Sequence, residues 1–240
     1  MHLQYLKRFY PDFKRKKILD LGSGRGDFLL ECHKEGIDVI GLEPNSEYIK
    51  LAEEKLYNYN FKTKIIKGSG ENIPFNDNYF DFINCTEVLE HVNEPSIVLK
   101  ECYRVLNEGG SLFITVHNRF GLMESHYGIL FLNWMPRFLG RLYIRFRKKE
   151  RNTNKHFDKQ KINEMHYYIY SNFKKEANNI GFKIFDARFE QINNPKLILN
   201  KKFKKIVIFF RNIKMFWLLK LLYFFLRFAY FNTFHLVLKK

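Results

Sequence analysis

The sequence predicts an α/β fold with a mostly parallel sheet. Short apolar segments with strand character alternate with longer amphipathic segments of helical period through the first half of the chain. A first apolar segment from Ile18 runs into a glycine-rich turn at 22–26, and a second, 37–42, ends in Glu43. In sheets of this kind, ligands bind beyond the carboxyl ends of the strands, and both features lie there. At 240 residues and 46% hydrophobic, the chain can bury one core, so we expect one domain.

Each element follows from its own local pattern. Ser46 is expected to be the N-cap of the second helix, and Gly181 to end the last helix of the core. The local sequence pattern and the turn residues predict helices over 27–35, 46–59, 94–106 and 171–180, and strands over 61–67, 182–189 and 233–239.

The glycine-rich turn predicts a site for a nucleotide-like ligand. Gly22, Gly24 and Gly26 let the backbone turn sharply and bring its N–H groups close to a ligand at a helix N-terminus. Their spacing is one residue tighter than the dinucleotide fingerprint, which disfavours NAD. Glu43, 17 residues after Gly26, stands where an acidic side chain accepts hydrogen bonds from both ribose hydroxyls.

At this point the chain resembles the class I S-adenosylmethionine-dependent methyltransferases, whose first motif has this acid-x-Gly-x-Gly-x-Gly form. The resemblance extends over roughly 100 residues. Residues 68–75 look like the adenine loop of that family, 79–84 like its fourth strand, and 106–116 like its fifth. The run Glu-Val-Leu-Glu-His-Val at 87–92 and the pair Asn118-Arg119 are similar to the ubiquinone-biosynthesis O-methyltransferases.

The resemblance implies a Rossmann-like three-layer sandwich with a seven-stranded, mostly parallel sheet and an antiparallel last strand. It also implies S-adenosylmethionine as cofactor, with Asp20 and the glycine turn at the methionine end, Glu43 at the ribose and Gly70 and Glu71 at the adenine. Ser69 departs from the family, in which an aspartate contacts the adenine amino group. The expected cofactor-binding residues are Asp20, Gly22, Ser23, Gly24, Gly26, Glu43, Gly70, Glu71, Asn72 and Thr86.

Two histidines are candidate catalytic residues. Methyl transfer from a sulfonium mainly requires alignment of acceptor and methyl group, but a hydroxyl acceptor benefits from a base with a pKa near neutrality. His91 follows the fourth strand and His117 ends the fifth, with helix capping and a loop hydrogen bond as their structural alternatives; His126 is a weaker candidate. Glu87, Glu90 and His91 could in principle ligate a divalent metal, but charges on a solvated face are commoner and no metal is predicted.

The predicted core is interrupted twice. A basic-aromatic helix over 1–16 precedes a cofactor-binding core over 17–117, and an acceptor-side insertion follows at 118–165, which is too long for an ordinary loop. A second, basic-aromatic insertion occupies 190–232, before the last strand.

Charge separates the two halves of the chain. Of the net charge of +16, residues 1–117 contribute 15 Lys and Arg against 18 Asp and Glu, whereas 118–240 contribute 26 against 7. A lysine-rich proteome would not spare the first half, so the second half is expected to face an anionic partner. Lysines interspersed with Phe, Leu and Trp over 200–230 favour a membrane surface over a membrane-spanning helix, which needs about 20 apolar residues. Burial against a partner subunit is the alternative.

These observations together predict a methyltransferase that acts on an oxygen of a membrane-resident or lipid-linked small molecule, such as a quinone precursor or a glycan intermediate. Three cysteines without CxxC spacing and no secretory signal indicate the cytoplasm, with peripheral binding to the inner face of the membrane. A nucleic-acid (RNA) methyltransferase is an alternative that the +19 of the second half favours. Cys85-Thr86-Glu87-Val88 opposes it, because base methyltransferases of this fold usually carry Asn/Asp-Pro-Pro-Tyr/Phe there. A non-catalytic cofactor-binding module is the third, and the oligomeric state is left open.

Overall fold

The computed structural model describes residues 3, 6–7, 12–62, 64–124, 126–147, 162, 164–198 and 200–240. Most of the helix predicted over 1–16 lies outside these residues, and the described part ends in a short 3-10 helix, Phe13–Arg15. Lys148 and Lys149 of the first insertion also lie outside them.

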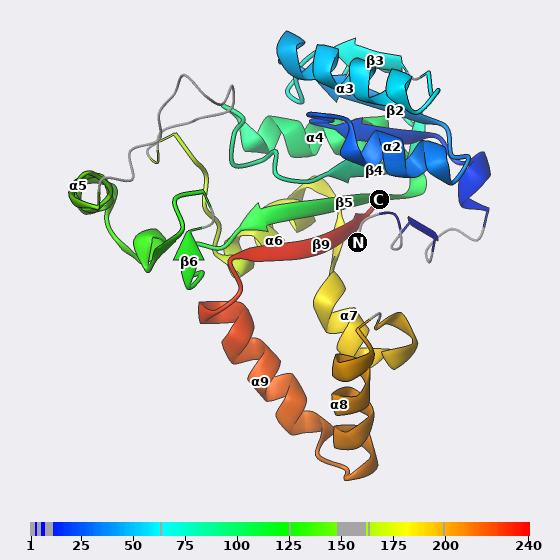
Figure 1. The fold of residues 1–240 in the computed structure, drawn as a ribbon. Helices are drawn as coiled ribbons and strands as arrows, with labels where there is room; N and C mark the ends of the chain where they lie inside the picture. The colour runs from blue at the N-terminus through cyan, green and yellow to red at the C-terminus, as the bar shows by residue number, and fades with distance from the viewer. Residues whose placement is uncertain are drawn as a thin grey trace. The chain divides into compact units, whose positions relative to one another are not determined.

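Seven strands form one sheet in the order β3-β2-β1-β4-β5-β9-β8 (Figure 1). Parallel pairs join β1 to β2 and β4, β2 to β3, and β4 to β5. The predicted mostly parallel sheet with an antiparallel last strand, flanked by helices, is therefore confirmed. The strands are β1 (Ile18–Leu21), β2 (Val39–Glu43), β3 (Lys64–Lys67), β4 (Phe80–Cys85), β5 (Leu106–His117), β8 (Lys183–Asp186) and β9 (Thr233–Lys239).

Four helices alternate with these strands close to their predicted positions. They are α2 (Asp27–Lys34), α3 (Ser46–Asn58), α4 (Pro95–Val105) and α6 (Tyr170–Ile180). The predicted N-cap of α3 was wrong by one residue: the Asn45 side chain accepts hydrogen bonds from the N–H groups of Glu47 and Tyr48, so Asn45 is the cap and Ser46 the first helical residue.

Contacts divide the chain into two compact units. The first comprises Met1–Thr115, Lys175–Ile184 and Leu238–Lys240, and the second comprises Val116–Lys174 and Phe185–Val237. Each is described separately below.

The second unit contains most of both predicted insertions. A two-stranded sheet, β6 (Met123–Glu124) and β7 (Ile129–Leu130), is followed by the 3-10 helix η2 (Leu132–Trp134) and by α5 (Arg137–Phe146). The strand predicted over 182–189 was too long, because the Asp186 side chain accepts hydrogen bonds from the N–H groups of Arg188 and Phe189 and starts a helix. That helix is α7 (Ala187–Asn193), and the 3-10 helix η4 (Pro195–Leu197) follows it.

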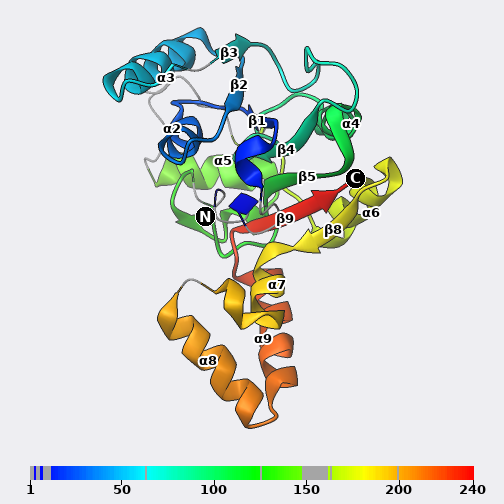
Figure 2. The ribbon, with the colours of Figure 1, turned by 90° about the vertical axis from the view of Figure 1, so that its right-hand side faces the viewer.

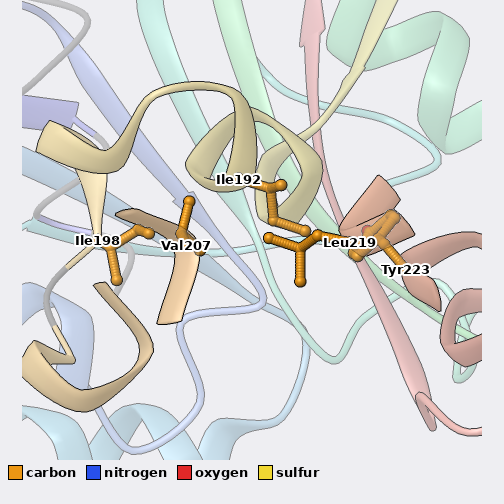
Figure 3. Close-up of a cluster of buried hydrophobic side chains, with 5 residues drawn as sticks. All are labelled: Ile192, Ile198, Val207, Leu219 and Tyr223. Atoms are coloured by element: carbon orange, nitrogen blue, oxygen red, sulfur yellow. The ribbon is translucent and has the colours of Figure 1, made fainter. Parts of the chain in front are cut away.

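Two further helices, α8 (Lys201–Asn212) and α9 (Phe216–Ala229), form a helical hairpin that runs directly into β9 (Figures 1 and 2). Buried apolar side chains from α7, α8 and α9 and from the residue after η4 pack into one cluster at its centre (Figure 3). The cluster contains Ile192, Ile198, Val207, Leu219 and Tyr223. This second insertion therefore has a hydrophobic core of its own. Among the described residues, no helix combines the length and apolar character needed to cross a membrane.

Candidate cofactor site

A buried carboxylate–amide pair lies at the centre of the candidate site. The parallel register of β1 and β4 places Asp20 opposite Asn84, and the Asn84 Nδ2 donates to Asp20 Oδ1 at 2.7 Å. Asp20 is only 2% exposed. Burial raises the pKa of Asp20 to about 7, the charges of Glu43 and Asp27 add to the shift, and the Asn84 hydrogen bond opposes it.

The glycine-rich turn begins directly after β1. The N–H groups of Gly22 and Ser23 both donate to the Leu42 carbonyl at the end of β2, and the N–H of Gly26 donates to the Ser23 carbonyl. Gly22 and Gly26 adopt left-handed backbone conformations, and a Cβ at Gly22 would collide with the Val88 side chain. Only glycine meets both requirements at that position, so the turn is tied to its residue type.

A cavity of about 330 Å³ opens at this turn and carries mostly polar side chains. It is lined by Asp20, Gly22, Ser23, Gly24, Arg25, Asp27, Phe28, Glu31, Asn84 and Thr86. Five of the predicted cofactor-binding residues, Asp20, Gly22, Ser23, Gly24 and Thr86, therefore line one cavity. Gly26, Glu43, Gly70, Glu71 and Asn72 do not line it. The sequence analysis missed Asn84, although a polar residue near the carboxyl end of a mostly apolar strand is a signal that could have found it.

The Glu43 side chain stabilises the glycine-rich turn by hydrogen bonds. Its carboxylate accepts hydrogen bonds from the N–H of Gly24 at 2.9 Å and from the N–H of Asn45 at 3.0 Å, and the side chain is buried. Each carboxylate oxygen has two acceptor positions, so these bonds leave room for the predicted contact with ribose hydroxyls. Glu43 therefore fixes the turn in addition to its predicted role.

The predicted adenine loop is held by Glu71. Its carboxylate contacts the Ser69 hydroxyl and accepts from the N–H of Asn93 at 3.0 Å. Partial burial acts to raise the pKa of Glu71, but hydrogen bonds from Ser69 and from backbone N–H groups lower it on balance. Gly70 is buried and Asn72 exposed. Ser69, which replaces the family's aspartate, here orders the loop through Glu71.

The two candidate bases differ in their surroundings. His91 is partly exposed, and its Nε2 lies 3.8 Å from Oε1 of the buried Glu90. The N-cap of α4 is Glu94, so the alternative in which His91 caps that helix is wrong. His117 belongs to the second unit, where it is buried and stacks on His126 with ring centroids 5.0 Å apart.

Around His117 the second unit contains a charged cluster that the sequence analysis did not predict. The buried Glu124 accepts hydrogen bonds from His126 Nδ1 at 2.8 Å and from the Tyr167 hydroxyl at 3.1 Å. Burial acts to raise the pKa of Glu124, but these bonds and that from the Tyr127 N–H outweigh it and hold the pKa below its ordinary value. An ionised Glu124 orients the His126 ring with its Nδ1–H toward the carboxylate.

The segment that carries this cavity is similar to known methyltransferases. Residues 19–114 match the family model described as a methyltransferase domain. The chain is 32% identical over 105 residues to a ubiquinone biosynthesis O-methyltransferase of Aliivibrio fischeri, covering 43% of this chain and 45% of that protein. It is 36% identical over 107 residues to the mitochondrial ubiquinone biosynthesis O-methyltransferase of Rattus norvegicus, covering 43% and 31%. The matches thus span less than half the length of these relatives.

Solved structures extend the likeness of the fold. A SAM-dependent methyltransferase from Archaeoglobus fulgidus aligns over all of this chain and 93% of its own, with a TM-score of 0.54 and 19% identity. One from Methanosarcina mazei aligns over 73% of this chain and 86% of its own, with a TM-score of 0.52 and 23% identity. Over residues 19–114 the chain is therefore similar to a methyltransferase domain, its fold is that of S-adenosylmethionine-dependent methyltransferases, and this likeness implies S-adenosylmethionine as the cofactor.

Proposed function

We propose that the chain is an enzyme that transfers the methyl group of S-adenosylmethionine to an oxygen of a small-molecule acceptor that resides in the membrane or is linked to lipid. The observation that carries this proposal is the cavity at the glycine turn. Asp20, Asn84 and Thr86 line it at the carboxyl ends of β1 and β4. The names of the curated relatives support an oxygen as the methylated atom.

The residues of the cavity fit this cofactor. S-adenosylmethionine supplies a methyl group already activated on a sulfonium, so the protein has to hold and orient it. Asp20 and Glu31 offer carboxylates toward the cationic methionine end, and the turn at 22–26 offers backbone N–H groups. Glu43, at the end of β2, would take the ribose, and the loop at 70–72 the adenine. We assign these roles to the cofactor-binding residues predicted from the sequence.

His91 and His117 remain the candidate bases for the acceptor hydroxyl. His91 has the exposure that a base in contact with an acceptor requires, and its Nε2 lies 3.8 Å from Oε1 of the buried Glu90. His117 is buried within the cluster of His126, Glu124 and Tyr167. We therefore rank His91 first as the base.

The acceptor class rests on the second unit. The surplus of cations after residue 117 and the basic, aromatic segment 200–230 support a peripheral location at an anionic membrane surface, on its cytoplasmic side. A quinone precursor with a long apolar tail or a lipid-linked glycan intermediate would be presented there. A small-molecule acceptor agrees with the curated relatives.

The test measures cofactor binding and turnover separately. Calorimetry with S-adenosylhomocysteine is expected to show one site per chain. Incubation with S-adenosylmethionine labelled in its methyl group, together with total membrane lipids, is expected to move the label into the organic extract. Binding without transfer to any lipid, quinol or glycan acceptor would leave a cofactor-binding module, and transfer of the label to RNA would replace the lipid acceptor.

Substitution of the histidines identifies the base in the same assay. His91→Gln is expected to lower kcat by about 10²-fold or more and to remove the acidic limb of the pH–rate profile, with unchanged affinity for S-adenosylhomocysteine. His33→Gln, in α2, is the control, because His33 stacks on Phe61 instead of lining the cavity. If His117→Gln alone shows this loss, His117 is the base instead.

A further inference from the structure

One face of α9 exposes a row of large apolar side chains. Trp217 and Phe225 are 62% and 67% exposed, the highest values in the row. The row consists of Trp217, Leu221, Phe224, Phe225 and Phe228, whose spacing of i, i+4, i+7, i+8 and i+11 places all five on one side of the helix. Below it, Leu219 and Tyr223 face the opposite way into the buried cluster of the hairpin. We call this row the α9 stripe.

The cations that interrupt the sequence of the hairpin do not interrupt the α9 stripe. The Arg227 Nη1 lies 3.5 Å from the Asp186 carboxylate, and its guanidinium covers the Tyr170 ring at 3.9 Å. The Lys220 ammonium lies 4.8 Å from the Phe216 ring centroid. The Lys220 ammonium also lies 5.8 Å from the Phe189 ring of α7, and the Arg227 guanidinium lies 4.8 Å from the Phe224 ring at the edge of the stripe. Both cations therefore lie at the border between the stripe and the body of the unit, an arrangement that was not visible in the sequence, where the cations of 200–230 follow no single helical face.

The start of α8 supplies the matching charge. Lys201, Lys202, Lys204 and Lys205 fall within its first five residues, and the chain contains no Asp or Glu after Glu190. Lys202 shares one face of α8 with Ile206 and Phe209, because these positions recur at helical spacing, and both apolar side chains are exposed, as is Ile213, the C-cap residue. Lysine at one end of a helix face and apolar residues along the rest is the composition of a helix that lies in a membrane interface.

The hairpin is anchored so that these faces keep their direction. The Tyr223 hydroxyl donates to Asp186 Oδ1 at 2.6 Å, and the side-chain amide of Asn118 donates to the carbonyls of Arg227, Phe228 and Phe231 at 2.9 to 3.2 Å. These bonds hold α9 within the second unit, and α8 packs against α9 through Val207 in the cluster shown in Figure 3. The apolar stripe is thus held on the outside instead of collapsing into the core.

We propose that the α8–α9 hairpin is a docking element for an anionic lipid bilayer, in which the four lysines contact headgroup phosphates while the α9 stripe enters the acyl boundary. This inference rests on the proposed function for its purpose, because a lipid acceptor requires the enzyme at the membrane. A second copy of the chain fits this face less well, because both hairpins would bring only positive charge to the contact. Trp and Phe at the boundary with basic residues beside them suit the bilayer.

Vesicle flotation of the full chain tests the proposal. Vesicles of equimolar phosphatidylcholine and phosphatidylglycerol are expected to bind the protein, and pure phosphatidylcholine vesicles to bind it at least about tenfold less, because each lysine near an anionic surface contributes about 1 kcal/mol. Substitution of Lys201, Lys202, Lys204 and Lys205 by Gln should reduce binding to the phosphatidylcholine level. The pair Trp217→Ser and Phe225→Ser should weaken binding to both kinds of vesicle, with retained helicity in circular dichroism.

Matched control variants test whether the location of the removed charge and apolar surface matters, or only their amount. Gln at the exposed Lys62, Lys100, Lys175 and Lys183 removes the same charge from the first unit, and Ser at the exposed Tyr57 and Ile97 removes comparable apolar surface there. Both control variants should bind vesicles as the unchanged chain does. Equal losses in test and control variants, or a dimer in light scattering that the Trp217/Phe225 pair dissociates, would overturn the proposal. Calorimetry with S-adenosylhomocysteine should be unchanged in all variants, so loss of docking stays distinct from failure of the methyltransferase assignment.

Discussion

Asp20 takes part both in the packing of the sheet and in the lining of the candidate cofactor cavity. Its carboxyl is buried between strands and receives one side-chain hydrogen bond, from Asn84, at the wall of the cofactor cavity. Such a group is poorly solvated until a cation arrives, which is the charge that the sulfonium and ammonium of S-adenosylmethionine bring. The raised pKa of Asp20 shows that its charged form is disfavoured in the folded chain, and a bound cation would favour that form.

Replacement of this carboxyl should change the pH dependence of stability. The pKa of Asp20 is raised from 3.8 to about 7, so the folded chain holds its proton more tightly than the unfolded chain does. The stability from this proton is complete below pH 4 and is lost as the pH rises through 7. We expect Asp20→Asn, compared with the unchanged chain, to gain stability between pH 4 and pH 8, by up to about 4 kcal/mol.

Urea denaturation at a series of pH values measures this difference, and Glu53→Gln, at an exposed position of α3, is the control. A constant difference between Asp20→Asn and the unchanged chain across that range would show that the carboxyl does not hold the extra proton. The same variant should lose affinity for S-adenosylhomocysteine at pH 8.

The glycine turn allows backbone strain to be separated from contact. Gly22 and Gly109 both adopt positive φ, near 70° and 75°. A Cβ at Gly22 would collide with Val88, whereas one at Gly109 would meet nothing within 4 Å. Gly109→Ala should therefore cost only the left-handed conformation, about 1 kcal/mol, and Gly22→Ala should cost clearly more and weaken cofactor binding. Equal losses of unfolding free energy in denaturant titrations would mean that Val88 yields without cost.

At the scale of elements, the residue after β5 binds the C-terminal end of α9. Asn118 immediately follows His117, is buried, and donates to three carbonyls at the C-terminal end of α9, while its own Oδ1 accepts from the Phe120 N–H at 2.9 Å. Its backbone N–H donates to Asn232. Asn118 therefore connects the second insertion to β5, the strand that ends in the candidate base His117. In the sequence it was noted only as part of an Asn-Arg pair.

Removal of this cap should loosen the hairpin. Asn118→Ala leaves buried carbonyls without their side-chain donor, and we expect a loss of about 1–3 kcal/mol in the free energy of unfolding. Hydrogen exchange should accelerate in α9 more than in α2 or α3. Asn178→Ala, at an exposed position of α6, is the control and should change neither quantity. Unchanged exchange in α9 would indicate that the buried cluster alone holds the hairpin.

At the scale of the whole molecule, charge and function divide in the same way. The half that carries the methyltransferase domain is mildly acidic, and the half that contains the hairpin holds the positive charge. In the proposed function, the first half would attract a cationic ligand such as S-adenosylmethionine and the second half an anionic membrane. Raised ionic strength should therefore weaken vesicle binding more than it weakens binding of S-adenosylhomocysteine.

Much of this organisation was predictable from local pattern. Helix α3 and strand β9 begin at the residues where the sequence places them, because apolar periodicity acts over a few residues, although the cap of α3 is Asn45 and not the predicted Ser46. The strand predicted over 182–189 was too long because Asp186, which suits a strand end, is also an N-cap residue for α7. Asn84 and Glu124 were missed because their roles depend on partners 64 and 43 residues away in the chain, Asp20 and Tyr167.

The sequence by itself determined the likeness of residues 19–114 to a methyltransferase domain, because the glycine turn, Glu43 and the motifs up to residue 116 are short segments whose spacing is enough to recognise. The cofactor-binding roles of these residues stay predictions. Only the tertiary structure decided which side chains meet around it and which way the hairpin faces. The burial of Asp20 against Asn84 and the contacts of Lys220 with Phe189 and of Arg227 with Asp186 are products of packing between distant elements. Periodicity assigns a residue to a face, but the contacts of that face exist only after the chain has folded.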